Sequence, residues 1–556
     1  MNNPRQSPLD SKVWLPALFA LTLVVGLLLG LQLRGEGPAI SRSIPISGSN
    51  YSSVTNGRVE EILRYVDARY VDDENREGLT RTAIRSVLDE LDPHSSFIPV
   101  EEIQALTEQM EGNFDGIGIE FMMVEDTIVV VSPVSGGPSE AVGILAGDKI
   151  IMIEDSLVAG PKAEGVDPTK LLRGEKGTKV NIQVKRFGKD ELIPFTITRD
   201  AIPMHSLDAA YTIADKTAYF KLNRFSARTY EEFQRALERL IEQEGIENVI
   251  LDLRHNPGGY LEQATKILSQ FFPDRGKLLV YTEGSHTPRK DYNSNGRAFF
   301  TLGDVAVLID EGSASASEIV AGAIQDHDRG IIIGRRSFGK GLVQEQYELK
   351  DGSALRLTVS RYFTPSGRSI QKSYEEGETE YNNDLSERFE SGELYGTGKI
   401  NIDSNLIFYT DAGHPVYGGG GISPDVFVPI DTSYNSETYL RLRQEIPAYV
   451  FRYLEQHSNV GEYADFNAFK ERFQPGDEVI NDLRNLVAEE TIVLDELSPF
   501  LKQELLQFFK ARVAKQLFGG DHFFRIYNED DEVINKALEI LRKDDPIATA
   551  RRSEEG

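Results

Sequence analysis

The stretch Asp310–Gln344 begins D-E-G-S-A-S-A-S-E-I-V-A-G-A-I-Q-D and ends F-G-K-G-L-V-Q. It follows Val305–Ile309, a short apolar run typical of a strand that is buried on both faces. Apolar residues then recur at helical spacing, at Ala316, Ile319, Val320, Ala323 and Ile324. Ser315 therefore lies where a buried strand passes into a helix, beside the unpaired N–H groups of the first helical turn. Ser313, Ser315 and Ser317 are also the residue type of turns and N-caps, so the serines alone do not define a nucleophile.

A second apolar run, Ile331–Ile333, leads into the loop Ser337–Gly341, which places Lys340 between two glycines. A lysine in apolar surroundings loses its proton readily, because desolvation disfavours the ammonium form. The neutral amine can then accept a proton from a serine hydroxyl such as that of Ser315. Gln344 follows in a segment of extended pattern, within reach of the amine as an orienting partner. The stretch therefore predicts an active site.

Further motifs surround this stretch: L-D-L-R-H-N-P-G-G at 251–259, L-D-P-H-S-S-F at 91–97, Y-F-T-P-S-G-R-S-I-Q at 362–371 and G-G-G-I-S-P-D at 419–425. Together with the serine and lysine motifs, they closely resemble those of the C-terminal processing peptidases, also called tail-specific proteases. The resemblance extends from about Arg58 to Asp425. It implies an α/β catalytic core like that of the crotonase and Clp-type protease folds.

The resemblance also implies a role for each site residue. Ser315 would be the nucleophile, Lys340 the general base and Gln344 the residue that positions the lysine. The turn at Gly258 and Gly259 would supply one half of an oxyanion hole, and the backbone N–H of Ala316 the other half. The sequence does not decide which glycine donates, and glycines are also what a tight turn requires. The family implies no cofactor, and the sequence contains no metal-binding motif.

A segment rich in strand and turn signals follows Asn113. Its sequence F-D-G-I-G-I at 114–119, followed by A-G-D-K-I at 146–150 and L-L-R-G at 171–174, resembles a bacterial PDZ domain that ends near Phe187. Backbone N–H groups around glycines can bind a terminal carboxylate, and an exposed sheet edge can accept a peptide as an added strand. We therefore expect the C-terminal tails of proteins to bind at Gly116, Ile117, Gly118 and Ile119.

The N-terminal residues Trp14–Leu33 form an uncharged run of about the length that crosses a bilayer as a helix. The run is long for a signal peptide, and Arg34–Glu36 offers no small-residue cleavage pattern, so a retained anchor is favoured. The family resemblance, rather than flanking charge, places the bulk of the chain in the periplasm. The predicted order is a cytoplasmic tail (1–12), transmembrane anchor (13–33), linker (34–56), helical region (57–111), PDZ domain (112–188), serine peptidase core (189–432) and helical C-terminal extension (433–556).

Composition excludes several other functions. A net charge of −28 argues against a nucleic-acid-binding surface, because phosphate contacts need clustered Lys and Arg. The absence of cysteine excludes disulfides and thiol nucleophiles.

The sequence G-R-R-S-F-G-K-G at 334–341 nearly matches a phosphate-binding loop, but Gly341 replaces the hydroxyl residue that binds magnesium. A Ser-His-Asp triad is also disfavoured. His255 and His327 lie near the motifs, but the sequence has no nucleophile-elbow serine for either of them to activate.

The sequence thus predicts a membrane-anchored serine endopeptidase that recognises substrates by their C-terminal tails. Two alternatives come from other classes: a catalytically silent PDZ scaffold, and a ligand-binding protein built on the same core. The complete set of Ser315, Lys340 and Gln344 argues against both. Residues 375–399 are expected to form a surface insertion. The helical extension is compatible with packing on the core, with a homo-oligomer or with binding of another partner.

Overall fold

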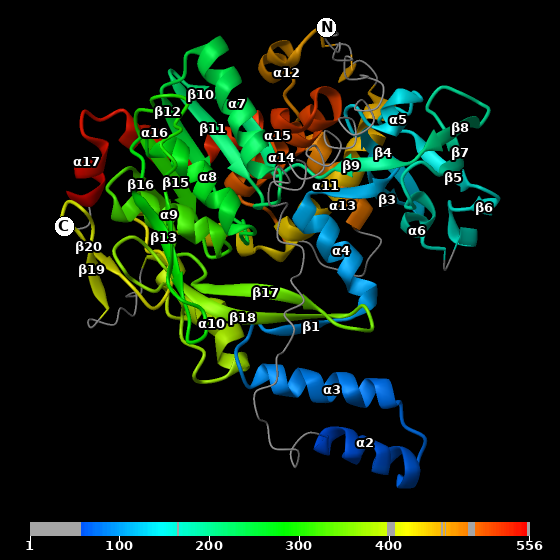
Figure 1. The fold of residues 1–556 in the computed structure, drawn as a ribbon. Helices are drawn as coiled ribbons and strands as arrows, with labels where there is room; N and C mark the ends of the chain where they lie inside the picture. Colours follow the sequence, from blue (N-terminus) through cyan, green and yellow to red (C-terminus); the bar gives the residue numbers. More distant parts are fainter. Residues whose placement is uncertain are drawn as a thin grey trace, which may run out of the picture. The chain divides into compact units, whose positions relative to one another are not determined.

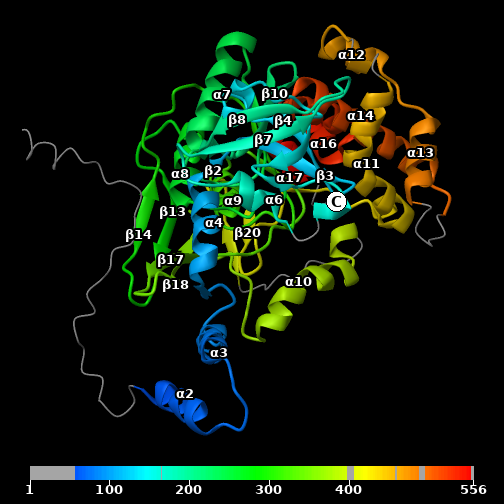
Figure 2. The same ribbon diagram turned by 90° about the vertical axis from the view of Figure 1, so that its right-hand side faces the viewer.

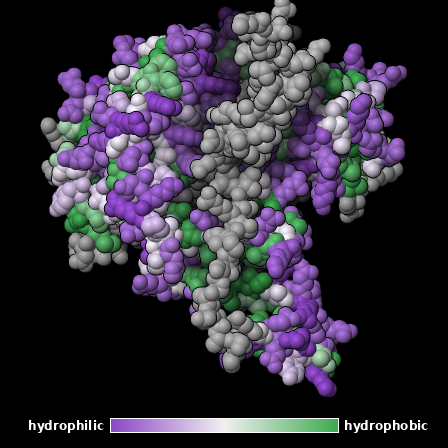
Figure 3. All heavy atoms as spheres, in the orientation of Figure 1, coloured by the Kyte–Doolittle hydropathy of each residue, from purple (hydrophilic) through white to green (hydrophobic). Residues whose placement is uncertain are grey.

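The computed structural model describes residues 57–163, 166–396, 406–457, 460–461, 463–487 and 495–552. The predicted cytoplasmic tail, anchor and linker (1–12, 13–33 and 34–56) lie outside these residues. Among the helices that are described, none is long and apolar enough to cross a membrane. Among the coloured residues of Figure 3, hydrophilic side chains predominate, with smaller apolar patches between them.

The chain divides into two compact units. The smaller unit contains the helices α2 (Arg58–Arg69) and α3 (Arg76–Asp89), the strand β1 (Ser96–Ile98) and residues 345–357. Both helices lie within the helical region predicted at 57–111. Within this unit β1 pairs antiparallel with the first residues of β18 (Ala354–Phe363).

In the larger unit, α4 (Val100–Glu111) precedes a domain with a five-stranded antiparallel path, in the order β3-β4-β5-β7-β8. Two further strands, β2 and β9, pair antiparallel with each other as a separate sheet. Its elements are β2 (Asn113–Gly116), β3 (Ile119–Val124), β4 (Thr127–Pro133), α5 (Pro138–Ala141), β5 (Lys149–Ile153), β6 (Ser156–Leu157), α6 (Pro168–Leu172), β7 (Lys179–Lys185), β8 (Ile193–Thr198) and β9 (Asp200–Pro203). The sheet continues through β8, so the domain extends beyond residue 188, where the sequence analysis ended it.

A six-stranded sheet in the order β10-β11-β12-β15-β16-β21 forms the centre of the larger unit (Figure 1). From β11 onward its strands are parallel. The strands are β10 (Leu207–Ala214), β11 (Thr217–Leu222), β12 (Asn248–Asp252), β15 (Val305–Ile309), β16 (Ile331–Gly334) and β21 (Val426–Phe427). All five residues of β15 are buried, as expected for a strand covered on both faces.

Alternate residues of these strands pack into two separate cores. One core lies against α7 (Thr229–Glu244), α8 (Leu261–Phe271) and α9 (Ala316–Asp326). The opposite face packs against α16 (Glu532–Leu541), with Ile534, Ala537 and Ile540 in contact with it. The C-terminal extension therefore supplies a layer of the catalytic core, so the predicted boundary at residue 432 divides one structural unit.

The remaining elements of the larger unit extend this core. They are β13 (Leu278–Glu283), β14 (Lys290–Asn293), β17 (Leu342–Glu348, which continues into the smaller unit), the end of β18, α10 (Glu378–Glu390), β19 (Ile407–Tyr409) and β20 (Pro415–Tyr417). The C-terminal helices are α11 (Glu437–Gln456), α12 (Phe466–Arg472), α13 (Asp477–Val487), α14 (Pro499–Phe518), α15 (Gly520–Tyr527), α16 and α17 (Pro546–Arg552). Figure 2 shows α11, α13 and α14 side by side, and their apolar faces form a helical core of their own.

Candidate active site

Ser315 occupies a strained turn between β15 and α9. It is the N-cap of α9, with φ 55° and ψ −111°, a conformation that non-glycine residues rarely adopt. Such strain persists only where the surroundings enforce it, and it is concentrated at functional sites. Ser315 is partly exposed, whereas Ala316 and the rest of α9 are buried.

The structure places the hydroxyls of Ser313, Ser315 and Ser317 in different surroundings. The Ser313 hydroxyl is buried and donates to the Leu253 carbonyl at 2.9 Å. The Ser317 hydroxyl is also buried and donates to the Asn256 carbonyl at 2.9 Å. These two side chains therefore fasten the turn to the loop that follows β12. Ser315 is the serine of the three that reaches the surface.

The loop after β12 places its glycines directly against this turn. A Cβ atom on Gly258 would lie 2.8 Å from both the Ala316 nitrogen and the Ser315 Cβ, so only glycine fits there. The Gly258 N–H is already bonded to Asn256 Oδ1 at 2.9 Å. By contrast, the N–H groups of Gly259 and Ala316 donate to no other residue in the described parts of the chain.

Lys340 and Gln344 are in contact, as the sequence analysis expected. Lys340 Nζ donates to Gln344 Oε1 at 3.1 Å, and Gln344 Nε2 donates to the His94 carbonyl at 2.5 Å. The His94 carbonyl thus fixes the amide so that its oxygen faces the lysine. The His94 ring nitrogen Nε2 lies 2.7 Å from the Tyr381 hydroxyl. Burial, and next the nearby charge of Lys340, lower the pKa of His94 to about 4.

A buried carboxyl group joins the serine turn to the lysine loop. Glu318 Oε2 accepts the backbone N–H groups of Ser315 (2.7 Å) and Lys340 (2.9 Å). Its other oxygen, Oε1, accepts the Ser337 hydroxyl (2.6 Å) and the Gly339 N–H (2.8 Å). Burial raises the pKa of Glu318 to about 7, although these four donors oppose that shift.

Helix α10 and the turn that follows it contact the lysine loop. Arg388 is buried and donates to the Ser337 carbonyl at 2.9 Å. The preceding residue of the loop, Arg336, forms an ion pair with Glu393 at 2.7 Å. The prediction that residues 375–399 form a surface insertion is therefore wrong in part, because the buried side chain of Arg388 holds the loop that carries Lys340.

Three of these supporting residues were missed or given no site role by sequence reasoning. Glu318 had a usable signal, since serine followed three residues later by glutamate is the capping-box pattern. His94 acts through its backbone carbonyl, which no side-chain motif reveals. Arg388 lies 73 residues beyond Ser315, in a helix without a distinctive pattern.

The predicted tail-binding residues lie in the antiparallel domain. Gly116 ends β2, and Ile117 is buried in that domain's core. Gly118 has φ +72°, which turns the backbone before Ile119 begins β3. β3 ends the strand path and pairs with β4 on one side, and no described strand pairs with its other edge.

Comparison with known proteins identifies the class of the molecule. A model of peptidase family S41 matches residues 216–378, and a PDZ domain model matches residues 116–197. A model of a family of unknown function matches residues 438–519. The chain is therefore a serine-type peptidase with a PDZ domain and a mixed α/β core, as the sequence motifs predicted.

Two individual proteins with similar sequences narrow the class of peptidase further. A carboxy-terminal-processing protease of Bartonella bacilliformis is 36% identical over 358 residues, which cover 63% of this chain and 80% of the relative. A probable CtpA-like serine protease of Staphylococcus aureus is 30% identical over 372 residues, covering 66% and 73%. The chain belongs to peptidase family S41 and, within it, to the carboxy-terminal-processing proteases.

Among solved structures, the photosystem II D1 C-terminal processing protease is 30% identical, with a TM-score of 0.33. That match covers 56% of this chain and 89% of the solved chain. The PDZ domain of a carboxy-terminal protease from Vibrio cholerae, solved in complex with a peptide, is 33% identical, with a TM-score of 0.15. It covers 16% of this chain and 97% of the solved chain.

Proposed function

We propose that the chain is a membrane-anchored endopeptidase that uses a Ser315–Lys340 dyad, with Gln344 as the orienting residue. One observation carries the proposal. A single oxygen, Glu318 Oε2, accepts the backbone N–H groups of both Ser315 and Lys340. The serine and the lysine are 25 residues apart in sequence, yet their backbone N–H groups donate to the same atom.

The chemistry follows from this arrangement. The neutral amine of Lys340 takes the proton of the Ser315 hydroxyl as its oxygen attacks the substrate carbonyl carbon. The resulting ammonium gives that proton to the leaving amine, and an acyl-enzyme remains on Ser315. Water then adds to the ester carbonyl and loses a proton to Lys340. The tetrahedral adduct breaks its bond to the Ser315 oxygen, Lys340 returns that proton to the oxygen, and the new carboxyl terminus is released. The hydrogen bond that Lys340 Nζ donates to Gln344 Oε1 orients the amine.

The developing oxyanion needs donors already in place. We assign this role to the N–H groups of Gly259 and Ala316. The Gly258 N–H is engaged by Asn256, which leaves Gly258 as the residue that permits close approach to Ser315. This assignment selects Gly259 from the two glycines that the sequence left open.

The experiment compares cleavage of an unfolded reporter protein with an apolar C-terminal tail. Ser315→Ala and Lys340→Ala should each abolish cleavage. The matched controls Ser373→Ala and Lys350→Ala change exposed residues of the same types and should cleave as the wild type does. Turnover by Ser315→Ala at the wild-type rate would refute the dyad.

The membrane anchor and the periplasmic location are further parts of the proposal, and they rest on the uncharged run Trp14–Leu33 and the family resemblance. A chain in which a cleavable export signal replaces residues 1–33 should move from the membrane fraction to the soluble fraction of the periplasm. Extraction of the full-length chain from membranes by alkaline carbonate would contradict a spanning helix.

Tail recognition is the remaining part. We propose that a free C-terminal carboxylate binds at Gly116, Ile117, Gly118 and Ile119 while the preceding residues pair with the free edge of β3. The edge position of β3 and the match to a PDZ domain support this.

A further inference from the structure

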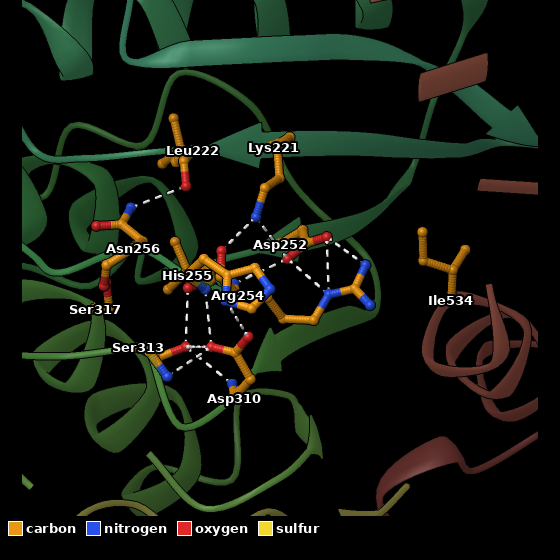
Figure 4. A network of polar contacts seen from close by, with 12 residues as sticks. Lys221, Leu222, Asp252, Arg254, His255, Asn256, Asp310, Ser313, Ser317 and Ile534 are labelled. Carbon is orange, nitrogen blue, oxygen red and sulfur yellow. Dashed lines mark hydrogen bonds and ion pairs between the residues drawn. The ribbon is translucent and has the colours of Figure 1, made fainter. Parts of the chain in front are cut away.

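The loop that carries Gly258 and Gly259 is anchored at its start by Arg254 (Figure 4). The Arg254 backbone N–H donates to Asp252 Oδ1 at 2.9 Å, and its carbonyl accepts Lys221 Nζ at 2.5 Å. Its guanidinium has two partners. Nη2 donates to Asp252 Oδ2 at 2.7 Å, and Nη1 donates to the carboxylate of Asp531 at 2.8 and 3.1 Å.

Asp531 belongs to the C-terminal extension, far beyond the part of the chain that the peptidase family model matches. It is the N-cap of α16, where its Oδ1 accepts the Ile534 N–H at 3.0 Å. Ile534 is fully buried against the central sheet. In Figure 4 the Arg254 guanidinium lies between Asp252 and Ile534. Packing of α16 thus fixes the position of the carboxylate.

The ion pair is formed in a largely desolvated place. The side chains of Arg254 and Asp531 are each 16% exposed, and that of Asp252 is 1% exposed. Lys221 completes the cluster at 3.2 Å from Asp252. Two cations and two carboxylates therefore balance there. Without the Asp531 charge, a net positive cluster would remain, and Arg254 Nη1 would lose one of its two acceptor oxygens.

The loop transmits the position of Arg254 to the proposed oxyanion donors. Asn256 lies two residues further on, and its Oδ1 holds the Gly258 N–H. The Asn256 carbonyl accepts the Ala314 N–H at 3.0 Å, which ties the loop to the turn that carries Ser315. A displacement at Arg254 would therefore move the Gly259 N–H relative to Ser315.

We propose that Asp531 is a positioning residue for the peptidase reaction, because its carboxylate holds Arg254 and so sets the oxyanion loop. This inference rests on the proposed serine chemistry and deepens it. It assigns the C-terminal extension a part in catalysis that goes beyond covering the sheet. Loss of the Asp531 carboxylate should therefore weaken stabilisation of the transition state and leave substrate binding largely unchanged.

The test uses Asp531→Asn in the full chain. Asparagine is a good N-cap, so α16 keeps its start while the charge is lost. The matched control is Asp465→Asn, which changes the N-cap aspartate of α12 in the same extension. For Asp531→Asn we expect kcat to fall about tenfold or more, with KM changed less than about twofold. Affinity for a peptide boronic acid, which forms a tetrahedral adduct with serine, should fall in parallel with kcat.

Several outcomes would overturn the inference. Kinetics of Asp531→Asn that match those of Asp465→Asn would do so, as would a change in KM alone. If Asp531→Asn unfolds at a lower temperature than the control, the variant Asp531→Glu, which restores the charge, distinguishes positioning from a loss of stability. Recovery of kcat by Asp531→Glu supports positioning, and failure to recover it overturns the inference. Cleavage by Ser315→Ala would instead refute the proposed function.

Discussion

Replacing Glu318 with glutamine tests the buried carboxyl that joins the serine turn to the lysine loop. The carboxyl oxygens accept four donors, three of them backbone N–H groups. In the better orientation, the glutamine oxygen keeps the N–H groups of Ser315 and Lys340, and its NH₂ group faces Ser337 and Gly339. The Ser337 hydroxyl can accept from that group, but the Gly339 N–H loses its partner. One buried donor without a partner costs about 1–3 kcal/mol.

The substitution should also remove a pH dependence of stability. The folded-state pKa of Glu318 is about 7, above its ordinary value of 4.5. A raised pKa means that this group's contribution to stability is fully present below about pH 4.5 and is lost as the pH rises through about 7. For a fully buried group the loss is of order 3 kcal/mol. Glutamine does not titrate, so the variant lacks this loss.

The measurement is denaturant unfolding of wild type and Glu318→Gln between pH 4 and pH 8. Glu262→Gln, which removes an exposed carboxyl in the first turn of α8, is the control for net charge. The difference in unfolding free energy between wild type and Glu318→Gln should shift by about 3 kcal/mol across the window, to the disadvantage of the wild type at high pH. Parallel curves would refute the reasoning, because they would show that Glu318 titrates alike in both states.

Four more predictions follow from the site and the core. Gln344→Ala should lower kcat with little change in KM in steady-state cleavage, because the lysine loses its orienting acceptor; an unchanged kcat would contradict that role. Ser315→Ala combined with Lys340→Ala should be no slower than either single variant, since a base without its nucleophile contributes nothing, and additive losses would separate the two residues. Amidation of a substrate tail should weaken binding to the PDZ domain roughly tenfold to a hundredfold in a titration, whereas equal affinities would show that the carboxylate is not read. Ile534→Ala should destabilise the fold by about 2–5 kcal/mol in denaturant unfolding, and a loss below about 0.5 kcal/mol would contradict burial of α16 against the sheet.

The sequence determined much of the fold and the chemistry because those features depend on local pattern. The apolar run Val305–Ile309 became a buried strand, and the helical spacing after Ser315 became α9. A parallel strand covered on both faces must be apolar throughout, so it can be recognised without knowing its neighbours. The family motifs likewise identified the peptidase and the PDZ domain, and the family models match those regions.

Only the tertiary structure decided how distant segments complete the site. The family motif selects Ser315 from the sequence, but only the structure shows that the hydroxyls of Ser313 and Ser317 are bonded to the Leu253 and Asn256 carbonyls. The contacts of Gln344 with His94 and of Arg254 with Asp531 join residues more than 200 positions apart, and such pairs leave no local period in the sequence. The role of α16 was hidden for a similar reason. An amphipathic helix shows that it has an apolar face, but not which surface that face will cover.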